Sequence, residues 1–87
     1  MRRSFERFLA RLEEHGLRDK IEQRALEQFV SLRALYEGPI KVPSIVAARR
    51  SIYRWLMKNG KGLNEVARLF DRLPSGVRKL VDGGKRK

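Results

Sequence analysis

Residues 63–81 read LNEVARLFDRLPSGVRKLV, and this stretch decides the fold. It predicts two short amphipathic helices, about 64–70 and 74–82, with the spacing of a helix-turn-helix unit. Such a unit needs a small residue at the helix crossing, a turn residue that tolerates a left-handed backbone, and apolar residues that attach the second helix. Ala67 is the small residue, Asp71 is the turn residue, and Val77 and Leu80 are the apolar residues. An ordinary helical hairpin is the alternative interpretation of this spacing.

The second of these helices has the two-sided character of a recognition helix. Pro74 suits its first turn, where the missing N–H has no intrahelical partner to lose. Its apolar side attaches it to the rest of the domain, and its polar side is free to enter a major groove. Arg78 and Lys79 could contact guanine or phosphate, whereas Gly76 lets the backbone approach closely. The predicted base-facing residues are Ser75, Gly76, Arg78 and Lys79.

A longer helix is predicted to precede this unit, from an N-cap at Ser44 to Asn59-Gly60 and on to Lys61. A basic stripe follows one edge of it, at a spacing that keeps the side chains within about 80° of one another. The stripe consists of Arg50, Arg54, Lys58 and Lys61. We expect these cations to contact backbone phosphates; the alternative is that their long stems only cover apolar surface. The helical phase of Tyr53, Trp55 and Phe70 predicts core positions rather than base stacking.

The remaining segments are also helical in pattern, and none alternates as a strand would. Helices are predicted at about 3–15, ended by Gly16, and at 18–30, with Phe29 on the buried face. Ser31 is a candidate N-cap for a short helix over 32–37, and a proline-rich loop follows it. The fold class is therefore predicted to be all-α.

Charge separates the chain into two unlike halves. The whole chain has 87 residues, 41% of them apolar, and a net charge of +11. Residues 1–38 carry eight basic and seven acidic residues, a net +1, whereas residues 39–87 carry thirteen basic and three acidic residues, a net +10. Like charges repel across a compact domain, so this excess favours a polyanionic partner for the second half.

Several classes of function find no support in the sequence. The chain has no cysteine, a single histidine (His15), and no serine with an evident base, so we expect no catalysis, no metal and no cofactor. No apolar run approaches the roughly 20 residues of a membrane span, and the N-terminus lacks a signal-peptide core. We therefore expect a cytoplasmic, nucleoid-associated protein with no membrane partner and no small-molecule substrate.

A family resemblance runs through three pieces of the chain, over residues 29–81. FVSLRALYEG resembles the segment that opens the C-terminal DNA-binding domain of the bacterial replication initiator DnaA, and VAARRSIYRWLMKNGKG resembles its long helix. LNEVARLFDRLPSGVRKLV resembles its helix-turn-helix, which is of the Trp-repressor type. The same module recurs in transposases related to the REP-associated group.

The resemblance implies double-stranded DNA as the partner, in replication, transposition or regulation. It implies that Arg49 or Arg50 occupies the place of an arginine that approaches the DNA backbone. The family's base-reading Asp-His-Thr-Thr corresponds here to Leu73-Pro74-Ser75-Gly76, so recognition of the initiator's own box is not carried over. The full set of predicted phosphate contacts is Arg49, Arg50, Arg54, Lys58, Lys61 and Arg72.

The predicted organisation is an N-terminal helical hairpin over 1–31, a helix-turn-helix domain over 32–82 and a basic tail over 83–87. The hairpin would most simply dock on the domain, and a homodimerisation arm is the alternative. The competing function is that of a protein-interaction adaptor, which keeps the fold without specific DNA readout.

Overall fold

The computed structural model describes residues 2–39 and 41–82, and the predicted basic tail at 83–87 lies outside these residues. The described residues form helices joined by short connections, with no strand among them. The predicted all-α fold class is confirmed. The helices are α1 (Arg2–Glu14), α2 (Arg18–Glu27), α3 (Leu32–Glu37), α4 (Pro43–Lys58), α5 (Leu63–Leu69) and α6 (Pro74–Asp82).

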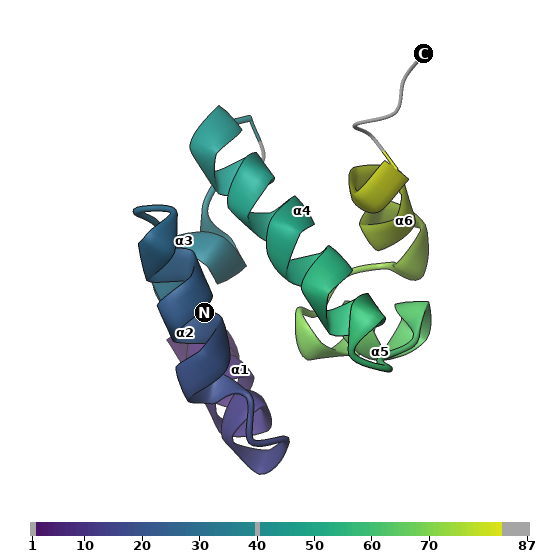
Figure 1. Cartoon of the computed structure of the whole chain (residues 1–87). Helices are drawn as coiled ribbons and strands as arrows, with labels where there is room; N and C mark the ends of the chain where they lie inside the picture. Colours follow the sequence, from purple (N-terminus) through teal and green to yellow (C-terminus); the bar gives the residue numbers. More distant parts are fainter. Residues whose placement is uncertain (1, 40, 83–87) are drawn as a thin grey trace.

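Helix α4 occupies the middle of the molecule. In Figure 1, α1, α2 and α3 lie to its left, α6 lies to its right, and α5 lies below its C-terminal end. Both α2 and α3 pack on α4, and so do α5 and α6. The helix is therefore covered on most of its circumference, which explains why its apolar residues face several directions.

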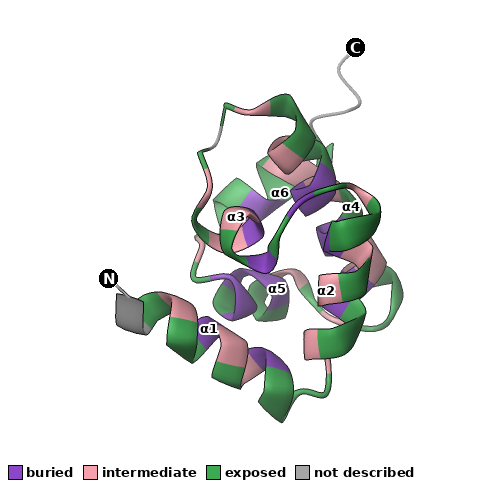
Figure 2. Cartoon of the chain, turned by 90° about the vertical axis from the view of Figure 1, so that its left-hand side faces the viewer, coloured by how far each residue is buried: buried purple, intermediate pink, exposed green. Residues whose placement is uncertain are grey.

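One core joins all six helices of the described chain. It extends from Phe8 and Leu12 of α1, through the middle of α4, to Val77 of α6. Figure 2 shows buried segments of the ribbon in helices from both halves of the chain, α1 and α5 among them. Phe8 stacks on Tyr36 with ring centroids 4.4 Å apart, and Tyr53 meets Phe70 edge-on at 4.9 Å. Residues on both sides of the predicted 31/32 boundary thus share one core, and the N-terminal helices are docked on it.

Four helices end in the same left-handed turn. In each, the residue after the C-cap has a positive φ, and its N–H and the following N–H bond back to the last turn of the helix, which is the Schellman arrangement. The four residues are Gly16 (φ 67°), Phe29 (φ 60°), Gly60 (φ 97°) and Asp71 (φ 55°). Glycine adopts this conformation without strain, whereas an L side chain there costs roughly 1–2 kcal/mol.

The prediction for the end of α2 is wrong. The helix stops at Glu27 rather than near residue 30, and Phe29 is 97% exposed instead of buried. The left-handed turn reverses the chain, so that Val30, only 4% exposed, enters the core in its place. The N-cap at Ser31 is confirmed, because its Oγ accepts a hydrogen bond from the Ala34 N–H at 3.0 Å.

Both ends of α4 also differ from expectation. The helix begins at Pro43 with Val42 as N-cap, so Ser44 lies inside the first turn and does not cap it. Proline takes the first position because its fixed φ suits the helix and it needs no hydrogen-bond acceptor there. At the other end, Gly60 turns the chain after Lys58, which places Lys61 in the connection to α5 and out of the helical stripe.

Candidate nucleic-acid interface

The turn between α5 and α6 has the geometry that the sequence predicted. Asp71 adopts the left-handed conformation, and the N–H of Arg72 closes the turn on the carbonyl of Ala67 at 2.8 Å. Ala67 is 1% exposed and Val77 is 1% exposed, as a close helix crossing requires. Helix α6 begins at Pro74, which confirms the predicted start.

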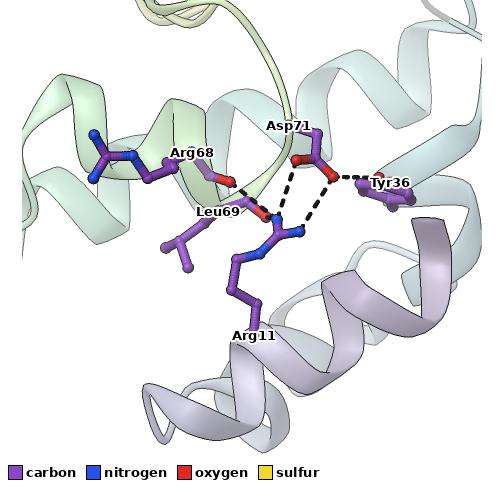
Figure 3. Close-up of polar contacts among 5 residues, drawn as sticks. All are labelled: Arg11, Tyr36, Arg68, Leu69 and Asp71. Atoms are coloured by element: carbon purple, nitrogen blue, oxygen red, sulfur yellow. Dashed lines mark hydrogen bonds and ion pairs between the residues drawn. The ribbon is translucent and has the colours of Figure 1, made fainter. Parts of the chain in front are cut away.

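The strained turn is fixed by side chains from the N-terminal half. Arg11 of α1 donates hydrogen bonds to the carbonyls of Arg68 and Leu69 at 3.0 and 2.9 Å, at the end of α5. The same guanidinium pairs with the Asp71 carboxylate at 3.3 Å, as Figure 3 shows. A cation at a helix C-terminus complements the helix dipole, so Arg11 stabilises both the end of α5 and the turn.

Tyr36 completes this network from α3. Its hydroxyl donates to the Asp71 carboxylate at 2.5 Å, and its backbone carbonyl accepts from Arg72 at 3.2 Å. Burial raises the pKa of Tyr36, and the hydrogen bond to the Asp71 carboxylate raises it further, so the hydroxyl stays protonated and remains a donor. Sequence analysis did not predict these roles of Arg11 and Tyr36, because the turn residues that they bond lie more than thirty positions away along the chain.

The predicted base-facing residues lie on the exposed side of α6. Ser75, Gly76 and Lys79 are exposed, and Arg78 is exposed with its guanidinium 3.6 Å from the Asp82 carboxylate. A solvent-exposed pair of this i,i+4 type contributes only about 0.3–0.5 kcal/mol, so a phosphate or a base can displace it. A Cβ added to Gly76 would meet no atom within 4 Å, so packing within the chain does not require glycine there.

Two arginines of the predicted stripe hold α6 against α4. Arg50 donates through Nε to the carbonyl of Leu80 at 3.0 Å, and Arg54 donates through Nε and Nη2 to the carbonyl of Val81 at 3.2 and 2.6 Å. They neutralise the last carbonyls of α6, which have no partner inside the helix. Their other guanidinium nitrogens form no hydrogen bond with the described residues, so these side chains both position α6 and leave donors beside its end.

Arg49 occupies a different environment from its neighbours. Only 3% exposed, it donates to the carbonyls of Leu35 at 2.7 Å and Gly38 at 2.8 Å, at the end of α3. Burial lowers the pKa of Arg49, and the nearby charge of Arg72 lowers it further. Because its guanidinium is enclosed by protein, Arg49 does not reach the surface at which a phosphate was expected.

The remaining predicted cations fall into two groups. Lys58 is exposed at the end of α4 and Lys61 is half-buried in the next connection; neither forms an ion pair within the described residues. Arg72 is half-buried and directed inward, where it bonds the carbonyl of Tyr36. The structure therefore gathers Arg50, Arg54 and the α6 residues, with Lys58 at the end of α4 and Lys61 in the connection that follows, and it separates Arg49 and Arg72 from them.

The aromatic residues do not form a base-stacking surface. Tyr53 and Phe70 are 2% and 1% exposed, in agreement with their predicted core positions. Trp55 is half-buried on the opposite side of α4, and the guanidinium of Arg24 lies 4.2 Å from its ring centroid. A cation–π contact of this kind covers the ring within the chain itself.

The described residues offer neither a metal site nor a membrane span. Across 2–39 and 41–82, no group of three His, Asp or Glu side chains could hold a metal ion. No helix in these two ranges has both the length and the apolar character of a bilayer span. The chain matches no protein-family model, and comparison with curated proteins and with solved structures returned no significant similarity. The resemblance to the initiator domain therefore stays a prediction from the sequence.

Proposed function

We propose that the protein binds double-stranded DNA, with α6 in the major groove and the basic edge of α4 on the adjacent phosphates. One observation carries the proposal: Arg50 and Arg54 join the outer edge of α4 directly to the C-terminal end of α6. The cations of the two helices therefore lie along one connected surface, as a helix-turn-helix protein needs for base and backbone contacts.

The charge balance of α4, α5, α6 and their connections supports an anionic partner. Residues 41–82 contain ten Lys and Arg but only Glu65, Asp71 and Asp82 as acids. Asp71 is already engaged by Arg11 and Tyr36, and Glu65 accepts from the Gly62 N–H at the start of α5. Only Asp82 therefore lies on the exposed side of α6, where it would repel phosphate or accept a hydrogen bond from cytosine N4.

The dimensions of α6 fit the same proposal. An α-helix with its side chains is roughly 10–12 Å across, which the major groove, roughly 12 Å wide, admits, and the nine residues of α6 present a little over two turns to it. Gly76 has open space where a Cβ would be, which permits close approach of a phosphate to the backbone. We infer that recognition is sequence-influenced, with Arg78 and Lys79 closest to the bases and a role in replication, transposition or regulation.

One observation favours the adaptor alternative. Phe29 and Leu26 are exposed at 97% and 58%, and both lie at the end of α2, away from the basic surface. Exposed apolar side chains of this size are typical of protein contacts rather than of DNA contacts. An adaptor would use this end of α2, whereas DNA binding would leave it free.

The direct test is fluorescence anisotropy with a labelled duplex of random sequence at 50–100 mM salt. We expect binding to wild type, and the Phe29→Ser variant should bind equally well because its side chain lies off the basic surface. Absence of binding to any duplex at this salt concentration contradicts the proposal and favours the adaptor.

Base reading is tested separately, after selection of bound fragments from a random duplex pool. Arg78→Ala should reduce the preference for the selected sequence over a scrambled one, because each good base contact contributes about 1–3 kcal/mol of discrimination. Lys58→Ala, at the far end of α4, should weaken both duplexes equally. Equal losses on both duplexes for Arg78→Ala would show that α6 only positions the protein.

A further inference from the structure

A cavity of about 230 Å³ lies between α4 and the start of α6, on the side of α6 away from Arg78. Its apolar lining consists of Val46, Val77 and Leu80, and its polar lining consists of Arg49, Tyr53 and Arg72. Gly76 forms part of its border and contributes no side chain. The volume is below the roughly 300–1,000 Å³ of pockets for drug-sized molecules, so only a small ligand fits.

The hydroxyl of Tyr53 is the polar end of a side chain that lines this cavity. The side chain is 2% exposed, and its hydroxyl forms no hydrogen bond with the described residues. No polar side-chain atom in this part of the chain is both fully enclosed and unbonded, so the hydroxyl must reach the open space that Tyr53 lines. It is therefore accessible to water or to a ligand, and an anionic acceptor forms a charge-assisted hydrogen bond there, which is stronger than one between neutral groups.

Two guanidinium groups, of Arg49 and Arg72, line the same cavity as this hydroxyl. Burial raises the pKa of Tyr53, whereas the charges of Arg72 and Arg49 act in the opposite direction. Arg49 bonds carbonyls through Nε and Nη2, so its Nη1 has no hydrogen bond to the described residues. Arg72 uses only Nη2, on the carbonyl of Tyr36.

No carboxylate lines the cavity to balance these two charges. The nearest acid in the sequence, Asp71, is engaged by Arg11 and Tyr36 on the other side of the turn. Two like charges near each other at a partly apolar site repel, and the charge of Arg72 adds to burial in lowering the pKa of Arg49. An anion between them removes this repulsion, and guanidinium groups bind carboxylates and phosphates through paired hydrogen bonds.

We propose that this cavity binds a small organic anion, a carboxylate or phosphate carried on an apolar body. The acid group accepts hydrogen bonds from the Tyr53 hydroxyl, from Arg72 and from Nη1 of Arg49. The apolar body lies against Val77 and Leu80. The ligand lies beneath the first turns of α6 and contacts them. Its binding therefore acts directly on the position of the helix that carries the predicted base contacts.

This inference does not depend on the proposed DNA binding, since the cavity, the phenol and the two arginines are present in the protein alone. The sequence predicted Arg49 and Arg72 as phosphate contacts but gave no sign of Tyr53 as a polar group, because its helical phase indicated only a core residue. The site is therefore a property of packing between α4 and α6.

The test is an NMR titration of the ¹⁵N-labelled full chain with phenyl phosphate and with benzoate, using benzyl alcohol as the uncharged control. Both anions should shift the amide signals of Gly76 and Val77 and the Nε–H signal of Arg72, and benzyl alcohol should not. Tyr53→Phe should weaken anion binding about tenfold, because it removes one hydrogen bond to a charged acceptor. This variant keeps the ring that packs on Phe70.

Arg72→Gln should weaken anion binding at least as much as Tyr53→Phe, and it leaves the Tyr53 ring in place as an independent check. Lys20→Gln, an exposed charge on α2, should leave the anion affinity unchanged. The proposal is overturned if Tyr53→Phe and Arg72→Gln bind the anions as tightly as wild type, or if benzyl alcohol binds equally well. It is also overturned if duplex DNA shifts these signals and neither small anion does.

Discussion

The helices before residue 38 and those after it differ in how many of their charged side chains form ion pairs. In α1–α3 the charges are balanced and partly paired within the same half, as Arg18 with Glu13 at 2.6 Å and Arg33 with Glu37 at 3.2 Å. In α4–α6 the single pair among the described residues that stays within that half is Arg78 with Asp82, at 3.6 Å. The contrast follows the acids, seven in residues 1–38 and three in residues 39–87, because both halves contain a similar number of arginines.

Four arginines bind carbonyls at the ends of helices and differ in this from the other cations. Arg49 caps α3, Arg11 caps α5, and Arg50 with Arg54 caps α6. These four cations serve the fold in both halves, in the same way, by binding carbonyls that the helices leave unpaired. What distinguishes the second half is that its remaining cations, chiefly lysines, have few acids beside them, since residues 41–82 contain only Glu65, Asp71 and Asp82 as acids. This excess of cations favours an anionic partner.

The largest expected effect is on a capping arginine. Arg49→Met should lower the free energy of unfolding by about 3 kcal/mol, because it leaves the buried carbonyls at the end of α3 without a donor. Urea denaturation followed by circular dichroism measures this. The matched control is Arg68→Met, an exposed arginine of α5, which should change stability by less than about 0.5 kcal/mol. Equal effects of the two variants would remove the distinction between capping and free cations.

A smaller effect is expected where the two halves meet. Arg11→Met should lower the free energy of unfolding by about 2 kcal/mol, since it removes two carbonyl bonds and the half-exposed pair with Asp71. In an Asp71→Gly background the loss should shrink, because glycine keeps the left-handed turn and the ion pair is already absent. A double-mutant cycle measures this difference. Strict additivity would contradict a coupled network at the turn.

The smallest effect concerns the one left-handed turn without glycine or a supporting partner. Phe29→Gly should raise the free energy of unfolding by about 1 kcal/mol, because it relieves backbone strain and the exposed ring has no core packing to lose. Gln28→Gly, one residue earlier at φ −107°, should lower it by about 0.5–1 kcal/mol. Thermal denaturation of both variants measures the difference. A destabilised Phe29→Gly would show that the ring contributes a contact.

Sequence reasoning found the features that depend on local pattern. The helical segments, the cap at Ser31, the start of α6 at Pro74 and the left-handed turn at Asp71 all follow from residue type and spacing. It placed Phe29 in the core because a period of 3.6 puts the residue on the buried face, but the helix ends at Glu27 and the left-handed turn at Phe29 itself overrides that phase.

The candidate surface was harder to predict, because a charged residue has the same helical phase whether it caps another helix or faces solvent. Arg49 and Arg50 are adjacent in the sequence, yet one is enclosed by α3 and the other reaches the end of α6. The partner carbonyls lie fourteen and thirty residues away. No local pattern carries that information.

The most direct test of the account is the salt dependence of duplex binding, compared between two double variants of equal charge. The account predicts a slope of log K against log[salt] of about −4 to −5 for wild type. Lys58→Gln with Lys61→Gln should make the slope shallower by about 1.8, whereas Arg7→Gln with Lys20→Gln, on the exposed sides of α1 and α2, should leave it unchanged. A flat wild-type slope, or an equal change for both double variants, would contradict a phosphate-binding surface on α4–α6.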